Sequence, residues 1–466
     1  MQIPILNGIF ADESGDFRTS YPVNMVPVPK ATGISAGYLR PADGIIAFGA
    51  GPGIDRGGIN WRGICYRVMG IKLVKVEANG KVTVLGEVGG AGQCSFDYSF
   101  DRLAITSSLK LFYYDGLNLI KVVDPDLGPV LSVMWIDGYF ACTDGSYIVV
   151  TELSDPMQVS PLKYGSSEVD PDPIVALRKT HNELVAVNRY SIEFFQNAGG
   201  SLFPFQRISG ANISKGCIGT HAVCVMQDSL VFIGSGRNEG LAVYAGGNAT
   251  ALKISTREID QLLLNYSEAE LSLVLLEARV QKGHQHLYMH LPDRTLVYDV
   301  EASKILQEPV WFALTSSLIG FAKYRARNFV YVYDAWICGD TLQAQCGKLT
   351  VEVSSHYGTD VRWEFGTMVV YNGSRSAVVH ELELVCLTGH VALGKDPTVS
   401  TSYSLDGETW SQAVSIRAGK LGERLNRLVW LQQGLLGMWR IQRFTGDSQT
   451  FLSCARLEAQ LEALSV

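Results

Sequence analysis

Three histidines have the residue type and spacing from which a metal site could be built. His284, His286 and His290 have the same parity within one apolar stretch, so all three can face the same side of a β-strand. A metal site needs such convergence, but no cysteine or carboxylate accompanies these histidines at ligand spacing. We therefore expect a polar strand face with one half-buried histidine, and neither a bound metal nor any other cofactor.

The segment Ser404–Trp410, Ser-Leu-Asp-Gly-Glu-Thr-Trp, has the pattern of the turn called an Asp-box. In such a turn Asp406 can accept hydrogen bonds from backbone amides, Gly407 can adopt a positive φ, and Trp410 can pack underneath. Sialidases carry several copies of this turn, but unrelated β proteins carry it too. A single copy therefore predicts a feature that stabilises a hairpin rather than a catalytic centre.

The glycine-rich run from Gly49 to Gly53 resembles a phosphate-binding loop in composition only. A phosphate loop holds its ligand at the N-terminus of the helix that follows, whereas the residues after Gly53 have the pattern of a strand. Pro52 also lacks the amide N–H that such a loop would donate. No cysteine–histidine pair and no pair of carboxylates stands out, so we expect that the chain is not an enzyme.

Residues 413–456 have a local excess of basic side chains, with only Glu423 and Asp447 as acidic residues. The basic residues are Arg417, Lys420, Arg424, Arg427, Arg440, Arg443 and Arg456. Such an excess can contact an acidic partner ring or a DNA backbone, and the first six are our candidate interface residues in this region. A solvated sheet face that binds no partner is the alternative.

Composition and charge exclude other classes of protein. The chain has 466 residues, of which 47% are hydrophobic and 18% charged, and its formal net charge is −7. Because duplex DNA is bound through lysines and arginines that replace its counterions, this chain is not expected to grip nucleic acid. Residues 1–16 lack a basic region and a long apolar run, so we expect no signal peptide, and no apolar window predicts a membrane-spanning helix.

The cysteines are odd in number and scattered, and no pair has the Cys-x-x-Cys spacing. This pattern argues against a disulfide framework or a zinc site and indicates assembly in a reducing compartment. We expect nearly all of them to be small buried hydrophobic groups. They are Cys65, Cys94, Cys142, Cys217, Cys224, Cys338, Cys346, Cys386 and Cys454.

Changes of pattern divide the chain into three regions. Residues 1–56 contain closely spaced prolines and predict an extended N-terminal arm, held by its own domain or by a neighbouring subunit. Residues 57–356 contain short apolar runs separated by turn signals. Residues 360–466 read as about seven further strands, which predicts a C-terminal β-sandwich after a linker over 354–360.

Within residues 57–356 a strand–turn–strand unit recurs about seven times, with a spacing of roughly 35–45 residues. Each unit has a central apolar strand such as Leu103–Thr106, followed by an aromatic-rich strand such as Lys110–Asp115. This is the period of a four-stranded propeller blade. We therefore expect an all-β fold with a β-propeller of about seven blades, and a pair of ordinary β-sandwiches is the alternative.

One segment interrupts the strand pattern and predicts a helical insertion over residues 256–272. Ser255 and Glu258 have the spacing of a capping box at its start. Apolar residues then fall on one helical face: Ile259, Leu262, Leu263 and Tyr266.

Short motifs in the chain resemble, in order, those of one protein family. They begin with Asp16-Phe17-Arg18, Tyr21-Pro22-Val23-Asn24-Met25 and Gly37-Tyr38-Leu39-Arg40, and continue with Tyr66–Gly70, Ser191–Phe195, Ile259–Leu271, His290–Pro292, Leu296–Asp299 and Cys338–Asp340. The set covers residues 12–360 and resembles the packaged-DNA-stabilisation, or tail-hub, proteins of short-tailed enterobacterial phages.

The resemblance implies a structural protein of the virion tail, assembled in the cytoplasm of the bacterial host. It implies a propeller-plus-sandwich subunit that forms a hexameric ring below the portal protein ring, closes it after packaging and stabilises the packaged genome. The ring would anchor the tailspikes and the tail needle, and genomic DNA would only pass through its channel during ejection. The protein would not bind a membrane. We take Phe17, Arg18, Tyr21 and Pro22 of the arm as candidate interface residues.

Two other classes of function stay open. A glycan-cleaving propeller would carry several Asp-boxes and an acid–tyrosine–arginine cluster at its channel, whereas the sequence shows one such turn and no such cluster. A glycan-binding or receptor-binding module would use the sandwich as its binder, and glycan binding by residues 360–466 would favour it.

Overall fold

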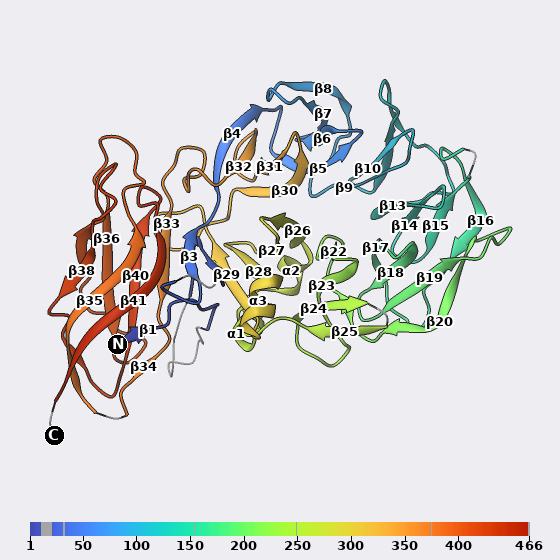
Figure 1. Cartoon of the computed structure of the whole chain (residues 1–466). Helices are drawn as coiled ribbons and strands as arrows, with labels where there is room; N and C mark the ends of the chain where they lie inside the picture. The colour runs from blue at the N-terminus through green and yellow to red at the C-terminus, as the bar shows by residue number, and fades with distance from the viewer. Residues whose placement is uncertain (11–20, 31–32, 154, 248, 374, 465–466) are drawn as a thin grey trace.

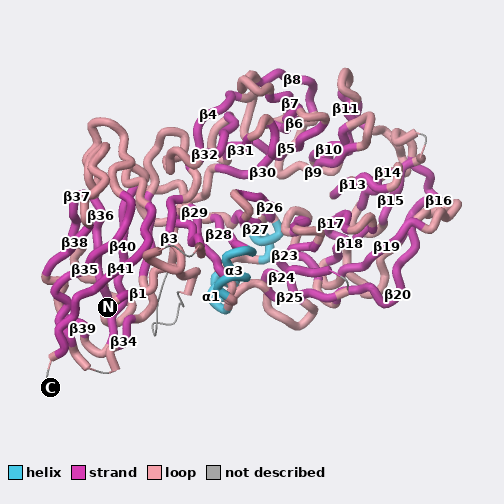
Figure 2. The backbone as a smooth tube through the Cα atoms, in the orientation of Figure 1, coloured by secondary structure: helices cyan, strands magenta, loops and turns pink. Residues whose placement is uncertain are grey.

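The computed structural model describes residues 1–10, 21–30, 33–153, 155–247, 249–373 and 375–464. The described chain folds into two β domains that lie side by side, a ring of small sheets and a pair of packed sheets (Figure 1). Strands and loops dominate both domains, and the helices lie only in the ring (Figure 2).

The first four blades of the propeller are antiparallel sheets whose strands follow chain order from the axis to the rim. Blade one contains β5 (Asp55–Trp61), β6 (Ile64–Met69), β7 (Lys72–Val76) and β8 (Val82–Glu87); blade two β9 (Ser95–Tyr98), β10 (Leu103–Ser107), β11 (Lys110–Tyr114) and β12 (Leu119–Lys121); blade three β13 (Ser132–Ile136), β14 (Tyr139–Thr143), β15 (Ile148–Thr151) and β16 (Val159–Gly165); blade four β17 (Ile174–Thr180), β18 (Glu183–Asn188), β19 (Ile192–Asn197) and β20 (Phe205–Ile213).

Three more blades complete the ring, so seven blades are formed by the described residues, as the repeat predicted. Blade five contains β21 (Gly216–Cys217), β22 (Val223–Met226), β23 (Ser229–Ser235), β24 (Ala242–Gly247) and β25 (Thr250–Lys253); blade six β26 (Leu275–Gln281), β27 (His284–His290), β28 (Thr295–Asp299) and β29 (Val310–Leu314); blade seven β30 (Ala326–Val332), β31 (Ala335–Asp340), β32 (Gln345–Thr350) and, from the N-terminal region, β4 (Gly44–Ala50).

The ring closes in blade seven, where strands from the two ends of the propeller sequence pair. The register of β32 with β4 opposes Gln345 to Ala50 and Thr350 to Gly44. The first and last units are thereby joined by backbone hydrogen bonds, which leaves no break between them.

The innermost hairpins of six blades share one turn geometry. Both residues of the turn have positive φ, as a type I′ turn requires, and this turn matches the twist of the strands that it joins. The turns are Arg62-Gly63, Asp137-Gly138, His181-Asn182, Gln227-Asp228, Lys282-Gly283 and Tyr333-Asp334. Blade two instead has a longer turn between β9 and β10, with Phe100 in it.

A buried ion pair within blade one is hydrogen-bonded to blade seven beside the closure. Arg67 and Asp55 are fully buried, and Arg67 Nε donates to Asp55 Oδ1 at 2.7 Å. Arg67 also donates to the carbonyl of Asn328 at 3.0 Å, and the Asn328 side-chain amide donates to Asp55 Oδ2 at 2.6 Å. Burial disfavours the charged guanidinium, yet Asp55 holds the pKa of Arg67 above its ordinary value. Hydrogen bonds between the charged groups of this pair and Asn328 therefore connect the first blade to the last.

The predicted helical insertion contains α1 (Arg257–Leu263) and α2 (Glu268–Ser272), between blades five and six. A third short helix, α3 (Val300–Leu306), lies between β28 and β29 and was not predicted. Ile259 and Leu263 of the expected apolar face are buried in the propeller core, and Leu271 of α2 is buried there too.

The predicted capping box at the start of the insertion was wrong in position. Thr256 caps α1 and accepts a hydrogen bond from the Ile259 amide, because the Ser255 hydroxyl already accepts one from a strand amide of β24. The capping box forms one helix later, where Ser267 and Glu270 satisfy each other's backbone amides at the start of α2.

The second domain is a sandwich of two sheets. One contains β1 (Gln2–Ile3), β2 (Met25–Val28), β3 (Tyr38–Pro41), β35 (Ala377–Leu387), β38 (Leu428–Leu431), β39 (Leu435–Leu436) and β41 (Ser453–Ala463). The other contains β33 (Arg362–Gly366), β34 (Val370–Tyr371), β36 (Thr398–Ser404), β37 (Val414–Arg417) and β40 (Trp439–Asp447). Aromatic rings fill the space between the two sheets. The ring centroids of Phe365 and Phe444 lie 5.2 Å apart in a stacked pair, and those of Trp430 and Phe444 lie 5.5 Å apart.

The N-terminal segment differs from the extended arm that its prolines suggested. β1 pairs with β41 in the register Gln2–Glu458, and β3 meets the same edge of β41 at Leu39 and Cys454. The segment thus supplies edge strands to the sandwich before β4 enters the propeller. Prolines are compatible with edge strands, because an edge residue need not donate an amide on its outer side.

Candidate functional site

The joint between the two domains is built on residues 22–24. Val23 exchanges two backbone hydrogen bonds with Glu364 of β33, at 2.8 and 3.0 Å. Its neighbours Pro22 and Asn24 each form a backbone hydrogen bond of 2.8 Å with Ala313 of β29. The Asn24 side-chain amide donates to the carbonyls of Thr315 at 2.9 Å and Arg362 at 2.7 Å. One strand-like segment therefore joins the outermost strand of blade six to the sandwich and holds the domains in a fixed relation.

The candidate interface residues of the N-terminal segment contribute to this joint where they are described. Tyr21 packs edge-on against Phe321 with ring centroids 5.6 Å apart, and its hydroxyl accepts a hydrogen bond from Arg294 at 3.2 Å. Burial raises the pKa of Tyr21. Pro22 is buried. Two further candidates, Phe17 and Arg18, lie outside the described residues.

Two of the basic candidates are occupied by contacts inside the sandwich. Arg440 is only 3% exposed, lies over the Tyr403 ring at 3.8 Å and donates to the carbonyl of Gln433 at 2.7 Å. Arg443 lies over the Trp410 ring at 3.9 Å. Because Arg440 is buried among internal partners, it is not available to a binding partner.

The remaining basic candidates lie at the surface and differ in their partners. Arg417 forms an exposed ion pair with Asp396, and Arg427 forms a two-pronged pair with Glu383. Lys420 and Arg424 are exposed in the β37–β38 loop. The charge excess of residues 413–456 is thus reduced locally by acidic residues from elsewhere in the chain.

The β37–β38 loop forms an apolar and basic tip on the sandwich. A backbone bond from Gly422 to Gly389 at 3.1 Å joins it to the loop after β35. Leu425 is 95% exposed and Leu393, in the joined loop, is 87% exposed, while Leu421 is also exposed. We call the exposed leucines of these two loops, together with the two basic candidates beside them, the sandwich tip: Leu393, Lys420, Leu421, Arg424 and Leu425. Exposed leucines beside basic groups are typical of a contact surface.

A second exposed apolar group lies at one end of blade two. Phe100, in the β9–β10 turn, is 91% exposed, and Leu117, in the β11–β12 turn, is 86% exposed. Both turns lie at the same end of the blade because alternate hairpins of a meander share an end. Arg62 of blade one donates to the Phe100 carbonyl at 2.7 Å and so orders this turn.

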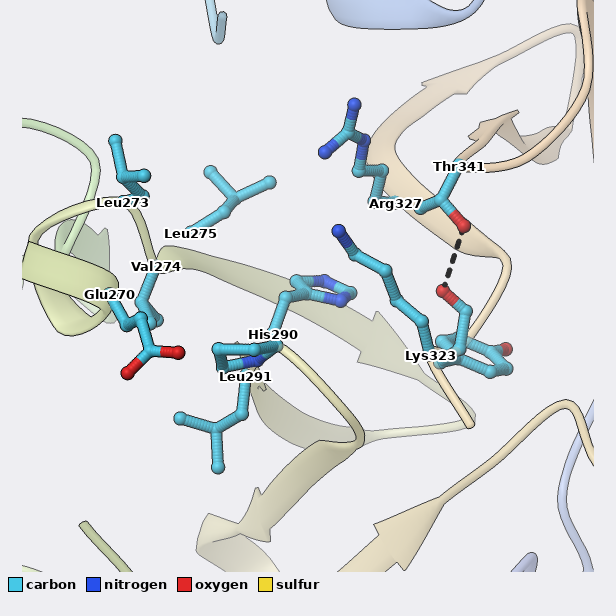
Figure 3. Close-up of a pocket in the computed structure, with 11 residues that line it drawn as sticks. Glu270, Leu273, Val274, Leu275, His290, Leu291, Lys323, Arg327 and Thr341 are labelled. Carbon is cyan, nitrogen blue, oxygen red and sulfur yellow. Dashed lines mark hydrogen bonds between the residues drawn. The ribbon is translucent and has the colours of Figure 1, made fainter. Parts of the chain in front are cut away.

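Hollows lie at the propeller axis, and one of about 700 Å³, lined by Arg56, Gln93, His221 and Arg327 among others, is far smaller than a nucleic-acid duplex. All seven blades contribute innermost-strand or adjoining residues to a hollow of about 270 Å³, among them Gly57, Asp97, Lys179, Glu277 and Phe329. A further hollow of about 230 Å³ lies beside blades six and seven, where His290, Lys323 and Arg327 approach one another (Figure 3). None of these volumes can admit a nucleic-acid duplex.

The three histidines of β27 divide into two groups. His290 is held by Glu277 at 2.7 Å and by Thr295 at 3.0 Å. His284 Nδ1 and His286 Nε2 both contact the same oxygen, Oδ2 of Asp299, at 2.8 and 3.1 Å. The expectation that no carboxylate joins the histidines was therefore wrong, because Asp299 reaches them from the neighbouring strand, and the register that opposes it to His286 is not visible in linear spacing.

The Asp-box has the geometry expected of a stabilising turn. Asp406 Oδ1 accepts hydrogen bonds from the amides of Glu408 at 2.9 Å and Thr409 at 2.7 Å, and Gly407 has a φ of +76°. A hydrogen bond from the Thr409 hydroxyl, together with these backbone bonds, holds the pKa of Asp406 below its ordinary value. The carboxylate is thus committed to its own turn and is not placed for acid–base catalysis on a substrate.

A serine motif that was missed in the sequence has no catalytic geometry either. Gly33-Ile34-Ser35-Ala36-Gly37 has the Gly-x-Ser-x-Gly spacing of a nucleophile elbow. Such an elbow requires a strand before the serine and a helix after it, whereas Ser35 lies between β2 and β3 and its hydroxyl donates to the Gly37 carbonyl at 2.5 Å.

A closed propeller joined rigidly to a sandwich defines the class of this protein as a two-domain β scaffold. A family model described as the β-propeller of bacteriophage P22 Gp10 matches residues 1–354, and one described as the β-sandwich of Gp10 matches residues 362–462. The chain therefore belongs to the bacteriophage P22 Gp10 family, and the resemblance inferred from the sequence motifs is confirmed.

The relatives differ widely in their similarity to this chain. The tail hub protein gp10 of Salmonella phage P22 is 28% identical over 473 aligned positions, which cover 96% of this chain and 95% of that protein. Among solved structures, the N-terminal domain of Nup159 has a TM-score of 0.41 at 7% identity, covering 74% of this chain and 99% of its own. The Pan2 WD40 domain of Neurospora crassa has a TM-score of 0.39 at 8% identity, covering 64% and 88%. No helix in the described ranges is long and apolar enough to cross a membrane.

Proposed function

We propose that this chain is a structural tail-hub subunit of a short-tailed phage. Six copies form a ring below the portal, close it after packaging, stabilise the packaged genome, and anchor the tailspikes and the tail needle until DNA is ejected. The subunit is assembled in the cytoplasm of the bacterial host and acts in the virion tail through shape and contacts, without catalysis or a membrane.

The observation that supports this proposal most is the match of both domains to the tail hub protein of phage P22. The alignment covers 96% of this chain and 95% of that protein, so it includes both domains described above. A scaffold subunit depends on its complete shape and on the relation between its domains. A match that preserves both domains together is therefore what a shared place in a tail would produce.

The physical properties of the two domains suit this role. A subunit that resists pressurised DNA must be stiff, and here the propeller is closed by β4 while the Val23 segment fixes the sandwich to blade six. Because the hollows at the propeller axis are far too small for a duplex, DNA would pass between subunits and not through any single propeller. The net charge of −7 favours sliding of DNA over adhesion.

Ring formation requires two different surfaces on each subunit, because a head-to-tail contact repeats the same pair of patches around the ring. The sandwich tip and the exposed end of blade two, with Phe100 and Leu117, lie on different domains. We propose these two surfaces as contacts with neighbouring copies or tail proteins, with Lys420 and Arg424 as the basic contacts.

Sedimentation of the full chain with portal rings of the same phage tests the proposal. The expected result is co-sedimentation that saturates at a fixed ratio of subunits to portal, with little binding to a portal from an unrelated phage. A chain that stays in the supernatant at every ratio, or that binds both portals equally, would contradict the proposal.

A further inference from the structure

One face of blade six brings two histidines and an aspartate together. His284 and His286 are two residues apart on β27, so their side chains leave the same face of the strand. Asp299 on β28 lies directly opposite His286 in the antiparallel register, and opposed residues also share a face. Tyr288, with the same parity on β27, packs with residues of blade seven, so this face looks towards that blade.

The distances within this group are close to those of a metal site. The two histidine nitrogens lie 2.8 and 3.1 Å from Asp299 Oδ2, and the three ligand atoms all lie within 4.8 Å of one another. In a tetrahedral zinc site the metal–ligand distances are about 2.0–2.2 Å, which places neighbouring ligand atoms roughly 3–3.5 Å apart. Small side-chain rotations would thus admit an ion between them.

The surroundings hold the carboxylate in position and leave one side open. Asp299 Oδ1 accepts a hydrogen bond from the Ala302 amide at 2.9 Å, so Oδ2 is the oxygen left for the histidines. His286 is 2% exposed and Asp299 is fully buried, whereas the side chain of His284 is 23% exposed. An ion held here would have protein on its inner side and a water molecule on its outer side.

The charges around the group also suit a cation. The nearby guanidinium of Arg279 is balanced by its ion pair with Asp43. Metal binding uses the neutral form of an imidazole and the ionised form of a carboxylate.

We propose that His284, His286 and Asp299 form a Zn²⁺ site that holds the β27–β28 hairpin to the start of α3. Two nitrogens and one oxygen suit zinc better than magnesium or calcium, which prefer all-oxygen ligand sets. Binding requires each imidazole to move its proton to the other ring nitrogen. His286 Nδ1 is buried without a partner, which disfavours a proton there, so binding is expected to be weaker than in a zinc site whose histidines donate to an outer partner.

Titration of the EDTA-treated full chain with Co²⁺ and with Zn²⁺ tests this site. The expected result is one ion per chain by calorimetry, with visible absorption from Co²⁺ bound to a nitrogen–oxygen ligand set. His284→Ala should weaken binding at least tenfold, while His380→Ala, which removes an exposed histidine paired with Glu462 outside the site, should not change it. His284→Ala keeps every cysteine, so binding by thiols would persist in it.

Folding of both variants is checked by their thermal midpoints without metal. His380→Ala should match the parent chain because His380 is exposed, and His284→Ala should fall only slightly because Asp299 keeps its contacts with His286 and the Ala302 amide. The proposal is overturned if the parent chain binds no ion above the buffer level. It is equally overturned if His284→Ala binds as tightly as the parent chain, because the metal would then lie elsewhere. Failure of the zinc proposal would leave the tail-hub proposal standing, because binding to portal rings is measured in a separate experiment.

Discussion

The propeller and the sandwich are both all-β, but they are assembled from the chain in opposite ways. Within the propeller nearly every strand pairs with the strand next to it in sequence, and one long-range pairing, β4 with β32, closes the ring. In the sandwich, β41 near the C-terminus pairs with β1 and β3 near the N-terminus on one edge and with β35 on the other. The propeller is therefore local and closed, whereas the sandwich depends on the two ends of the chain meeting.

This difference teaches how the molecule can act as one rigid body. The N-terminal segment enters the sandwich as β1, contacts blade six around Val23, returns to the sandwich as β2 and β3, and then closes the propeller through β4. Closure of one domain and completion of the other thus use the same stretch of chain. Damage at the propeller closure, at the joint or at the sandwich surface should have consequences of decreasing size.

The largest effect is expected from Asp55→Ala at the propeller closure. The change leaves the Arg67 guanidinium buried without its counter-ion and removes the acceptor of the Asn328 amide. Breaking one half of a buried pair typically costs about 3–5 kcal/mol. Chemical denaturation should show this loss, while Asp396→Ala at the exposed pair with Arg417 should cost less than about 1 kcal/mol. Equal losses in the two variants would contradict the role given to the closure.

The next effect is expected from Asn24→Ala at the joint. Asn24 has a φ of +53°, which alanine adopts with strain, and its side chain makes three hydrogen bonds to Thr315 and Arg362. We expect a loss of about 2–4 kcal/mol and separate unfolding of the two domains in a calorimetric scan. Asn24→Gly relieves the strain but not the lost bonds, so it should recover only about 1 kcal/mol. A single transition in both variants would argue against the joint.

A smaller effect, present at neutral pH and fading in acid, is expected from Asp340→Asn in blade seven. Although burial opposes ionisation, hydrogen bonds from Arg325 and Gln345 hold the pKa of Asp340 below its ordinary value. A lowered carboxyl pKa stabilises the fold above the unfolded-state pKa, and this stabilisation is lost as the pH falls through the folded-state value. Stability should thus fall more steeply below about pH 4 in the parent chain than in the variant. Parallel curves of unfolding free energy against pH would contradict this expectation.

The smallest effect on stability, but a large one on assembly, is expected at the sandwich tip. The double change Leu421→Asp and Leu425→Asp alters exposed side chains and should shift the unfolding free energy by no more than about 0.5 kcal/mol. Binding to portal rings or formation of subunit rings should fall at least tenfold, as measured by sedimentation. The matched control Leu252→Asp changes an exposed leucine on the rim strand of blade five. If this control weakens assembly equally, the tip has no special role.

The sequence predicted the parts of the fold whose partners are close along the chain. The seven blades could be inferred because each is a meander in which consecutive strands pair, so the repeat is visible as a period. The pairing of Gln2 with Glu458 could not be inferred, because no local pattern marks a partner at the other end of the chain. The same limit caused residues 1–56 to be read as an arm.

The candidate residues show the same division. Parity placed His284 and His286 on one face, but Asp299 joined them only through the register of a hairpin. Counting charges identified a basic segment, but it could not show that Arg440 is buried against Tyr403 while Lys420 is exposed. Whether a charged side chain is buried or exposed depends on its place in the fold, which a count of charges does not give.

Electron microscopy of the full chain mixed with portal rings tests the central claim most directly. The account predicts rings of propeller-plus-sandwich subunits on the outer end of the portal, with the sandwich in one fixed orientation to its propeller in every copy. Portals that stay bare, or subunits whose two domains take many relative orientations, would contradict it.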